Sequence, residues 1–273
     1  MDVVREVLAI LGEQAADKLT PAPEIASLPA ARPHLSFFID GSHAEMGKLT
    51  FVRTIAFAYK GNIQKKFKRE FYVIGQQSIP AQDSSGREDA GLMRRLAELR
   101  LAEDIAKQHE NALIVLDGSL DSPTVEEQNS LLRLEKTCIS RNNTLAGISK
   151  TCSYTLQGKL VTNVVEHCCK TGYIPFGESF IVKLHEKATY AFRLDVKGDF
   201  MQALQALRYY ANDPSFFGYP YPLIRADAQA KITQKEIQAK KSLLASRAGK
   251  DWSRIKGLLQ DAHVIIDKIN KNG

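Results

Sequence analysis

Two apolar segments, each running directly into the tripeptide Asp-Gly-Ser, constrain the fold of this chain most strongly. They read LSFFIDGS at residues 35–42 and LIVLDGS at residues 113–119. Short uninterrupted apolar runs are typical of strands covered on both faces of a sheet. Because Asp and Gly are also common turn residues, one copy alone would indicate no more than a turn. Two copies leave two interpretations open: plain turns, or two buried strands that each end at a carboxylate, Asp40 and Asp117.

The second interpretation predicts a metal site. Carboxylates at the ends of neighbouring central strands emerge at the edge where open α/β sheets bind their ligands. Two such groups repel and raise each other's pKa unless a cation neutralises them. Oxygen ligands favour a hard ion, Mg²⁺ or Mn²⁺, whose remaining ligands are water and substrate phosphate. The chemistry that such a site serves is phosphodiester hydrolysis.

The order of the predicted elements indicates an α/β fold, a mixed sheet flanked by helices. A meander of three antiparallel strands is followed by a long helix with Ser85 as its N-cap, a strand, a helix and a fifth strand. That is the element order of an RNase H-like fold. These elements are predicted at residues 34–40, 48–60, 65–75, 84–109, 111–117, 124–140 and 144–150.

Further elements follow the fifth strand. We expect a helix, a two-stranded unit within residues 179–195 and two closing helical segments. The chain is predicted to form a single domain with a core at about residues 35–232 and helical additions at 1–20 and 233–270.

The charge balance suits a polyanionic partner without identifying one. The chain has 37 Lys and Arg against 31 Asp and Glu, a net charge of +6. The run KKFKRE interleaves cations with Phe67, so that Lys65 and Lys66 are candidates for contacts with nucleic-acid phosphates. The alternative is a solvated strand face.

Other features of the sequence favour a cytoplasmic location. The first residues contain acidic groups and no cleavage site, which indicates an amphipathic helix and not a signal peptide. No apolar run approaches the ~20 residues that span a bilayer. The four cysteines form no CxxC pair, which favours reduced thiols over a zinc site or disulfides.

The long helix offers two glutamates to the predicted site. On a helical wheel Glu103 lies among apolar residues, whereas Glu98 lies at the flank. A glutamate among apolar neighbours is costly to bury unless it is paired or coordinating. A solvated helix charge remains the alternative for each.

Four motifs in order, IDGS, LDGSL, GISK and YPYPLIRAD, resemble the NurA family of archaeal and bacterial DNA nucleases. The resemblance runs from Leu35 to Ile232, most of the chain. It implies an RNase H-like core and a Mn²⁺-dependent (or Mg²⁺-dependent) nuclease that forms a homodimer. It also implies that the protein acts on DNA together with the hexameric helicase-translocase HerA, in DNA end resection and repair. The chain has no Walker A motif, so any motor must be a partner.

The resemblance also implies the site residues. Asp40 and Asp117 match the family's strand-borne metal ligands, and Glu98 is similar to its helix-borne glutamate, against the preference of the helical wheel. Tyr219 and Asp227 match a late catalytic pair, although many relatives have His at the position of Asp227. Lys150, in GISK, is placed where it meets a phosphate.

Two other functions stay open. One is a non-catalytic RNase H-like adaptor that binds DNA or a motor ATPase, which has no need of acidic groups facing a phosphate. The other is a metal-dependent phosphatase or nucleotidase acting on small substrates, which the basic charge balance disfavours.

Overall fold

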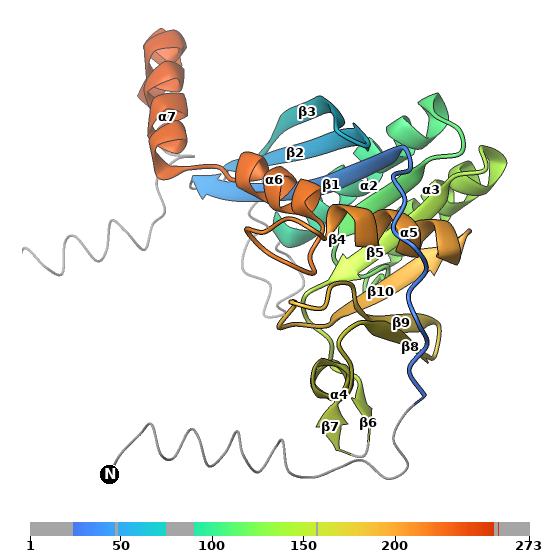
Figure 1. The fold of residues 1–273 in the computed structure, drawn as a ribbon. Coiled ribbons are helices and arrows are strands. Elements are labelled where there is room, and N and C mark those ends of the chain that lie inside the picture. The colour runs from blue at the N-terminus through green and yellow to red at the C-terminus, as the bar shows by residue number, and fades with distance from the viewer. Residues whose placement is uncertain (1–23, 47–48, 75–89, 157, 254–255, 257–273) are drawn as a thin grey trace, which may run out of the picture. The chain divides into compact units, whose positions relative to one another are not determined.

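A mixed sheet of eight strands, flanked by helices, forms the centre of the fold (Figure 1). The computed structural model describes residues 24–46, 49–74, 90–156, 158–253 and 256. In sheet order the strands are β3 (Ile63–Ile74), β2 (Leu49–Lys60), β1 (Ser36–Met46), β4 (Leu113–Asp117), β5 (Thr144–Ser149), β10 (Phe192–Lys197), β9 (Ser179–Lys183) and β8 (Gly172–Phe176). This architecture confirms the predicted α/β fold.

Helices and a short hairpin complete the described part of the chain. The helices are α2 (Ala90–Gln108), α3 (Val125–Ser140), α4 (Val161–Cys168), α5 (Phe200–Tyr210), α6 (Tyr221–Ala230), α7 (Gln234–Ala248) and the 3₁₀ turn η1 (Gly249–Asp251). The hairpin joins β6 (Thr155–Leu156) to β7 (Lys159–Leu160). None of the helices in the described ranges combines the length and the apolar character needed to cross a membrane.

The chain divides into two compact units, which we describe separately. The β1–β4 unit contains the described residues within 35–117, 121–145 and 222–256. The β8–β10 unit contains residues 24–34 and 118–120 and the described residues within 146–221. The single-domain boundaries stay a prediction.

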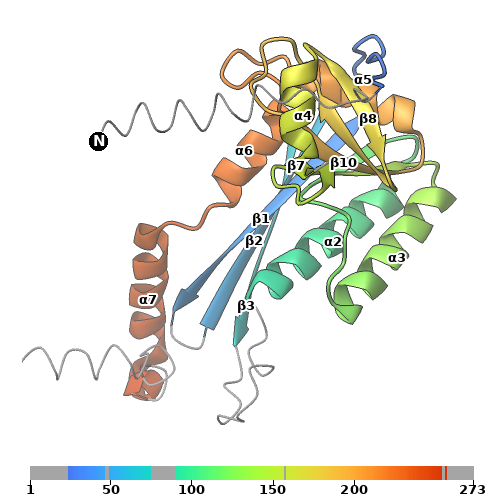
Figure 2. The ribbon, with the colours of Figure 1, turned by 90° about the horizontal axis from the view of Figure 1, so that it is seen from below.

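In the β1–β4 unit, helices cover both faces of the sheet. β1 pairs with β2, and β2 with β3, in antiparallel fashion, whereas β1 pairs with β4 in parallel. Helix α2 packs on β1, β2 and β4, with α3 packed on its outer side, while α6 lies on the opposite face of β1–β3 (Figure 2). Phe37, Ile39 and Leu99 are among the fully buried side chains of this core.

Strand β1 is longer than predicted, which corrects the position of Asp40. We expected the strand to end at this residue, but β1 continues through Gly41 and Ser42 to Met46. These residues stay paired with β2, where Asp40 is opposite Ile55 and Met46 is opposite Leu49. The paired backbone satisfies its hydrogen bonds across Asp-Gly-Ser, so the tripeptide makes no turn here.

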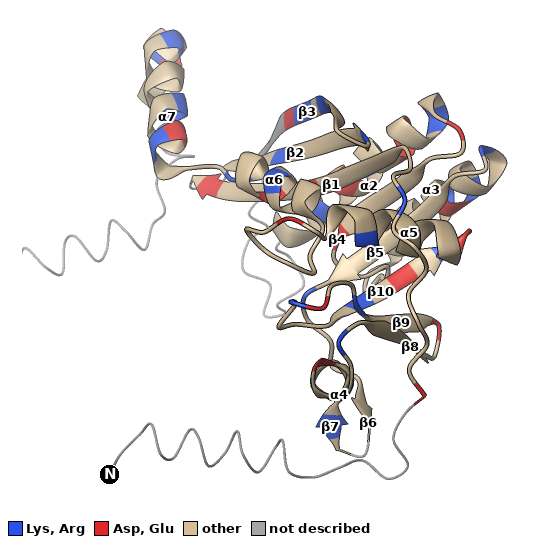
Figure 3. Cartoon of the chain, viewed as in Figure 1, with Lys and Arg blue, Asp and Glu red and all other residues tan. Residues whose placement is uncertain are grey.

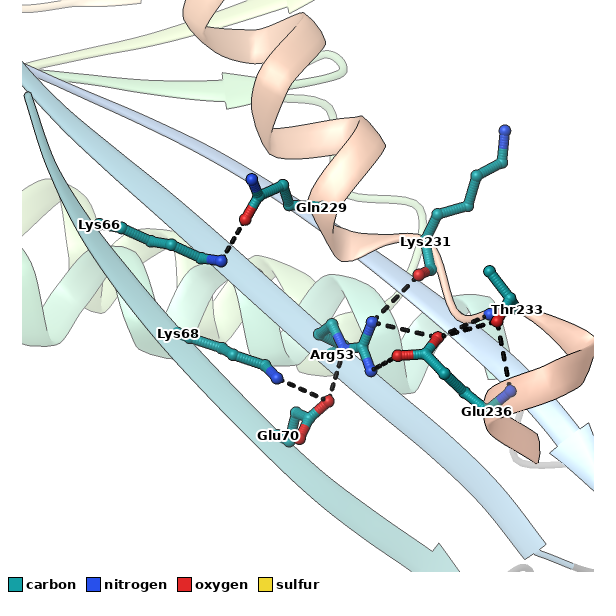
Figure 4. A network of polar contacts seen from close by, with 8 residues as sticks. All are labelled: Arg53, Lys66, Lys68, Glu70, Gln229, Lys231, Thr233 and Glu236. Carbon is teal, nitrogen blue, oxygen red and sulfur yellow. Dashed lines mark hydrogen bonds and ion pairs between the residues drawn. The ribbon is translucent and has the colours of Figure 1, made fainter. Parts of the chain in front are cut away.

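A polar network connects the start of α7 to the sheet of the β1–β4 unit (Figure 4). Arg53 on β2 is buried, with its Nε 2.5 Å from Glu70 Oε1 and its Nη2 2.8 Å from Glu236 Oε1. Its Nη1 also donates to the Lys231 carbonyl, at 3.0 Å. Glu236 closes a capping box with Thr233 at the N-terminus of α7. We call Arg53, Lys68, Glu70 and Glu236 the Arg53 cluster.

The β8–β10 unit has its own apolar core and contains strands that the sequence interpretation missed, the short β6 and β7 and the longer β8. Val161 and Val165 of α4 pack with Ile174 of β8 and Ile181 of β9. Strand β8 was not predicted, because Pro175 and the flanking glycines in GYIPFG resemble a loop.

Several predicted features coincide with observed elements, and others lie outside the described residues. The helix predicted over 124–140 is α3, which begins at a capping box formed by Thr124 and Glu127. Helix α7 falls within the predicted addition at 233–270. The N-terminal helix at 1–20, Ser85 and the residues after 256 lie outside the described ranges.

Candidate active site

The β1–β4 unit brings the two Asp-Gly-Ser aspartates side by side. In the parallel ladder Ile39 is the partner of Leu116, and Asp40 and Asp117 are the next residue on each strand. Asp40 is buried, and the backbone N–H of Gly41 donates to its Oδ1 at 2.7 Å. The aspartates therefore lie together because the two strands are in register, although only Asp117 is at a strand end.

Glu98 reaches the same region from α2. Its side chain is fully buried, with Oε1 2.7 Å from Arg94 Nη1 and Oε2 3.2 Å from Arg95 Nη1. Arg94 Nη1 also lies 4.0 Å from Asp40 Oδ1. The i,i+4 and i,i+3 spacings on one helix explain why both guanidinium groups can hold one carboxylate.

Gly41 provides the space that Glu98 occupies. A Cβ built on Gly41 would lie 2.7 Å from Glu98 Oε1 and 3.1 Å from Glu98 Cγ. Any side chain at this position would therefore push the glutamate away from β1. Gly41, Arg94 and Arg95 were missed as site residues, although the arginines at positions −4 and −3 from Glu98 were a readable signal.

Glu103 lies elsewhere, which corrects the helical-wheel interpretation. Its Oε1 is 2.6 Å from Lys107 Nζ, and its Oε2 is 3.9 Å from Arg133 Nε on α3. The wheel assumed one buried face, but α2 packs against both the sheet and α3. Glu98 faces the sheet, whereas Glu103 sits in ion pairs beside α3.

Electrostatics connects these carboxylates with a fourth on α6. Burial, together with the negative charges of Asp117, Glu98 and Asp227, raises the pKa of Asp40 from 3.8 to about 8. Burial also raises the pKa of Glu98, while Arg94 and Arg95 oppose that rise. We call Asp40, Glu98, Asp117 and Asp227 the carboxylate cluster.

The donor set of the carboxylate cluster fits a hard divalent cation. Its oxygens are the ligands that Mg²⁺ and Mn²⁺ prefer, and a cation would remove the repulsion that raises the pKa of Asp40. Within the described ranges, no three acidic, His or Cys side chains are already close enough together to hold a metal ion. In the same described ranges, Cys138, Cys152 and Cys169 form no such group either.

Lys150 and Tyr219 lie together in the β8–β10 unit. The Lys150 Nζ is 4.9 Å from the centroid of the Tyr219 ring, a cation–π distance. Tyr219 is 2% exposed, and its ring packs against Phe192 at 5.0 Å. These two residues, predicted from separate motifs, thus form one contact pair.

Lys65 and Lys66 lie on β3, the edge strand of the sheet, and both are exposed. Lys65 Nζ lies 5.2 Å from the centroid of the Phe67 ring, and Lys66 donates to Gln229 of α6. As neighbours on one strand the two lysines point to opposite faces. Figure 3 shows Lys and Arg along β3 and in the neighbouring α6 and α7.

The fold is similar to solved structures of NurA. The NurA nuclease from Sulfolobus solfataricus has 16% identity and a TM-score of 0.66, over 92% of this chain and 95% of that one. A NurA with manganese has 9% identity and a TM-score of 0.59, over 90% and 98%. A NurA bound to dAMP and manganese has 10% identity and a TM-score of 0.54, over 90% and 95%.

Sequence comparison gives the family. No curated protein matches the chain significantly. The family model described as the NurA domain matches residues 34–232, which contain all the predicted site residues. Because this match covers well over half of the sequence, the chain belongs to the NurA domain family.

Proposed function

We propose that this protein is a divalent-metal-dependent nuclease that hydrolyses DNA phosphodiester bonds. The observation that carries the proposal is the carboxylate cluster, in which side chains from β1, β4, α2 and α6 act on one another electrostatically. Membership of the NurA domain family supports it, as does the similarity to a NurA nuclease and to a NurA bound to dAMP and manganese.

In this proposal the carboxylate cluster holds Mn²⁺ or Mg²⁺. A bound ion of this kind supplies an activated water and offsets the charge that develops on the phosphate. The protein contributes the positions of the oxygens: the β1–β4 register sets Asp40 beside Asp117, and Gly41 leaves room for Glu98.

Residues outside the carboxylate cluster have separate proposed roles. Tyr219 is proposed as a catalytic residue and Lys150 as a phosphate contact, supported by their mutual packing. Lys65 and Lys66 are proposed to contact the DNA backbone from the edge strand, supported by their exposure.

The finer features of the proposal come from the family resemblance. They are action on single-stranded DNA and DNA ends in resection and repair, a HerA-type hexameric ATPase as partner, a homodimer and a cytoplasmic location. The net charge of +6 is compatible with a DNA substrate.

The test is a cleavage assay on single-stranded and double-stranded DNA with Mn²⁺, with Mg²⁺ and with EDTA. We expect cleavage with a divalent ion and none with EDTA. Asp117→Asn serves as the inactive control, and Glu103→Gln as a matched helix variant that keeps its activity. A folded protein that binds DNA but never cuts it, with or without a HerA-type ATPase, would support the adaptor function instead.

A further inference from the structure

Arg94 lies against two residues of the carboxylate cluster at once. Its Nη1 is 2.7 Å from Glu98 Oε1 and 4.0 Å from Asp40 Oδ1. Its stem runs close over Gly41, where a Cβ would lie 3.2 Å from Arg94 Cγ. The guanidinium group thus provides positive charge at the point where two negative groups from different elements meet.

The neighbouring Arg95 differs in reach and exposure. Its Nη1 is 3.2 Å from Glu98 Oε2, and its side chain is 12% exposed, against 33% for Arg94. The Arg94 side chain is therefore more open to solvent than the Arg95 side chain. Since its long side chain is rotamer-rich, Arg94 can leave the carboxylates without any backbone movement.

We propose that Arg94 is a resident counter-ion that a divalent cation must displace from Asp40 and Glu98. This inference rests on the proposed function, because it concerns the same carboxylate cluster. An Mg²⁺ or Mn²⁺ ion bound directly by Glu98 uses the oxygen lone pair that accepts from the Arg94 guanidinium. At Asp40 the ion takes the place of the guanidinium charge 4.0 Å away. Two cations at one place also repel each other. Arg94 stabilises the metal-free protein and lowers its affinity for the metal.

The competing explanation is that Arg94 only orients Glu98 for its role as a ligand. Under that explanation, removal of Arg94 leaves Glu98 badly placed and weakens metal binding. Under ours, removal frees the oxygens and strengthens metal binding. The sign of the change in metal affinity therefore separates the two explanations, with no need for a cleavage assay.

The experiment measures Mn²⁺ binding without DNA, by the electron paramagnetic resonance signal of free Mn²⁺. We expect Arg94→Gln to bind Mn²⁺ about tenfold more tightly than the wild type, the effect of removing one partly exposed charge pair. Arg95→Gln is the matched control and should gain less, because Arg95 lies 3.2 Å from Glu98 Oε2 against 2.7 Å for Arg94 and Oε1, and is less exposed to solvent. Asp40→Asn gives the background of weak surface sites.

A second measurement follows thermal stability with and without the ion. Without metal, Arg94→Gln should melt below the wild type, since Glu98 loses a partner. At saturating Mn²⁺ that difference should shrink or reverse, because the tighter ligand stabilises the variant more. If Arg94→Gln fails to fold, Arg94→Lys keeps the charge but lacks the guanidinium Nη1 that lies beside both carboxylates, and it should also bind Mn²⁺ more tightly.

Equal or weaker Mn²⁺ binding by folded Arg94→Gln, or by Arg94→Lys in its place, would overturn the inference while leaving the proposed function intact. A wild type that binds no more Mn²⁺ than Asp40→Asn would remove the metal site itself, and with it both proposals.

Discussion

The carboxylate cluster and the Arg53 cluster are two ionic groups in the same unit, each built around a buried charged side chain, and their charges are balanced in different ways. The Arg53 cluster joins two cations to two carboxylates, so its formal charges cancel (Figure 4). The carboxylate cluster sets four acidic side chains against two guanidinium groups, which leaves an excess of two negative charges if all are ionised.

The pKa values follow this difference. Hydrogen bonds from Arg53 and the Thr233 backbone lower the pKa of Glu236 to about 2. Burial opposes the ionisation of Glu70, but hydrogen bonds from Arg53 and Lys68 outweigh it and lower its pKa. Burial and like charges instead raise the pKa of Asp40 to about 8. A compensated cluster holds elements together, whereas an uncompensated one is suited to binding a cation.

The largest expected effect is on cleavage. Asp40→Asn keeps the shape of the side chain but removes a charge that a metal would need, so cleavage should fall by at least about 10³-fold. Folding should persist, and DNA affinity without metal should hold or rise, because a group that repels phosphate has been neutralised. Initial rates and a binding titration measure the two effects. Near wild-type cleavage would remove Asp40 from the site.

The corresponding change in the Arg53 cluster should act on stability. Arg53→Met keeps apolar volume but leaves Glu70 and Glu236 without their shared partner. The free energy of unfolding should fall by about 1–3 kcal/mol. The fall is limited because both carboxylates are partly exposed, so that water can solvate them once the guanidinium is gone. Denaturant unfolding measures this change, and Lys136→Met, at an exposed position of α3, is the control. A loss of metal affinity with no loss of stability would contradict the comparison.

A change of pH should separate the two clusters further. The pKa of Asp40 is about 8 in the folded protein and 3.8 as its ordinary value, so between these pH values the folded state binds the extra proton. The stability of the metal-free protein should therefore fall as pH rises from about 4 to about 8, by on the order of 2–4 kcal/mol.

The Arg53 cluster should contribute no slope between pH 5 and pH 8. The lowered pKa of Glu236 stabilises the fold above its ordinary value of 4.5, and this contribution disappears only as pH falls toward about 2. Asp40→Asn should thus flatten the dependence of stability on pH between pH 5 and pH 8. Glu236→Gln should lower the stability but leave this pH dependence unchanged. Equal slopes in the wild type and Asp40→Asn would assign the pH dependence to another group.

The smallest expected effect is on the edge strand, outside both clusters. Replacing Lys65 and Lys66 by Ala should weaken DNA binding modestly and reduce the salt dependence by up to about one unit of slope per lost phosphate contact. Binding titrations at several salt concentrations measure this, with Lys136→Ala as a control at a distant helix. An unchanged slope would indicate that β3 faces no phosphate.

Much of the fold was predictable because it depends on local pattern. The apolar runs of the strands and the helical segments between them gave the element order, and that order gave the α/β class. Strand β8 was missed, because its pairing with β9 overrides a sequence that resembles a loop. The extension of β1 beyond Asp40 was missed for the same reason. Its backbone hydrogen bonds are made with β2, and the local sequence around Asp40 does not indicate this pairing.

By itself, the sequence determined which strands are buried and that two of them carry an aspartate. Apolar runs and the residues that directly follow them are local properties of the chain. Only the tertiary structure decided which carboxylates meet. The β1–β4 register sets Asp40 beside Asp117, and the two packed faces of α2 turn Glu98 toward them and Glu103 away. The missing side chain of Gly41 then lets Glu98 and Arg94 approach the strand. Such choices depend on distances between segments far apart in the chain, and helical periodicity alone favoured Glu103, which the structure places in ion pairs beside α3.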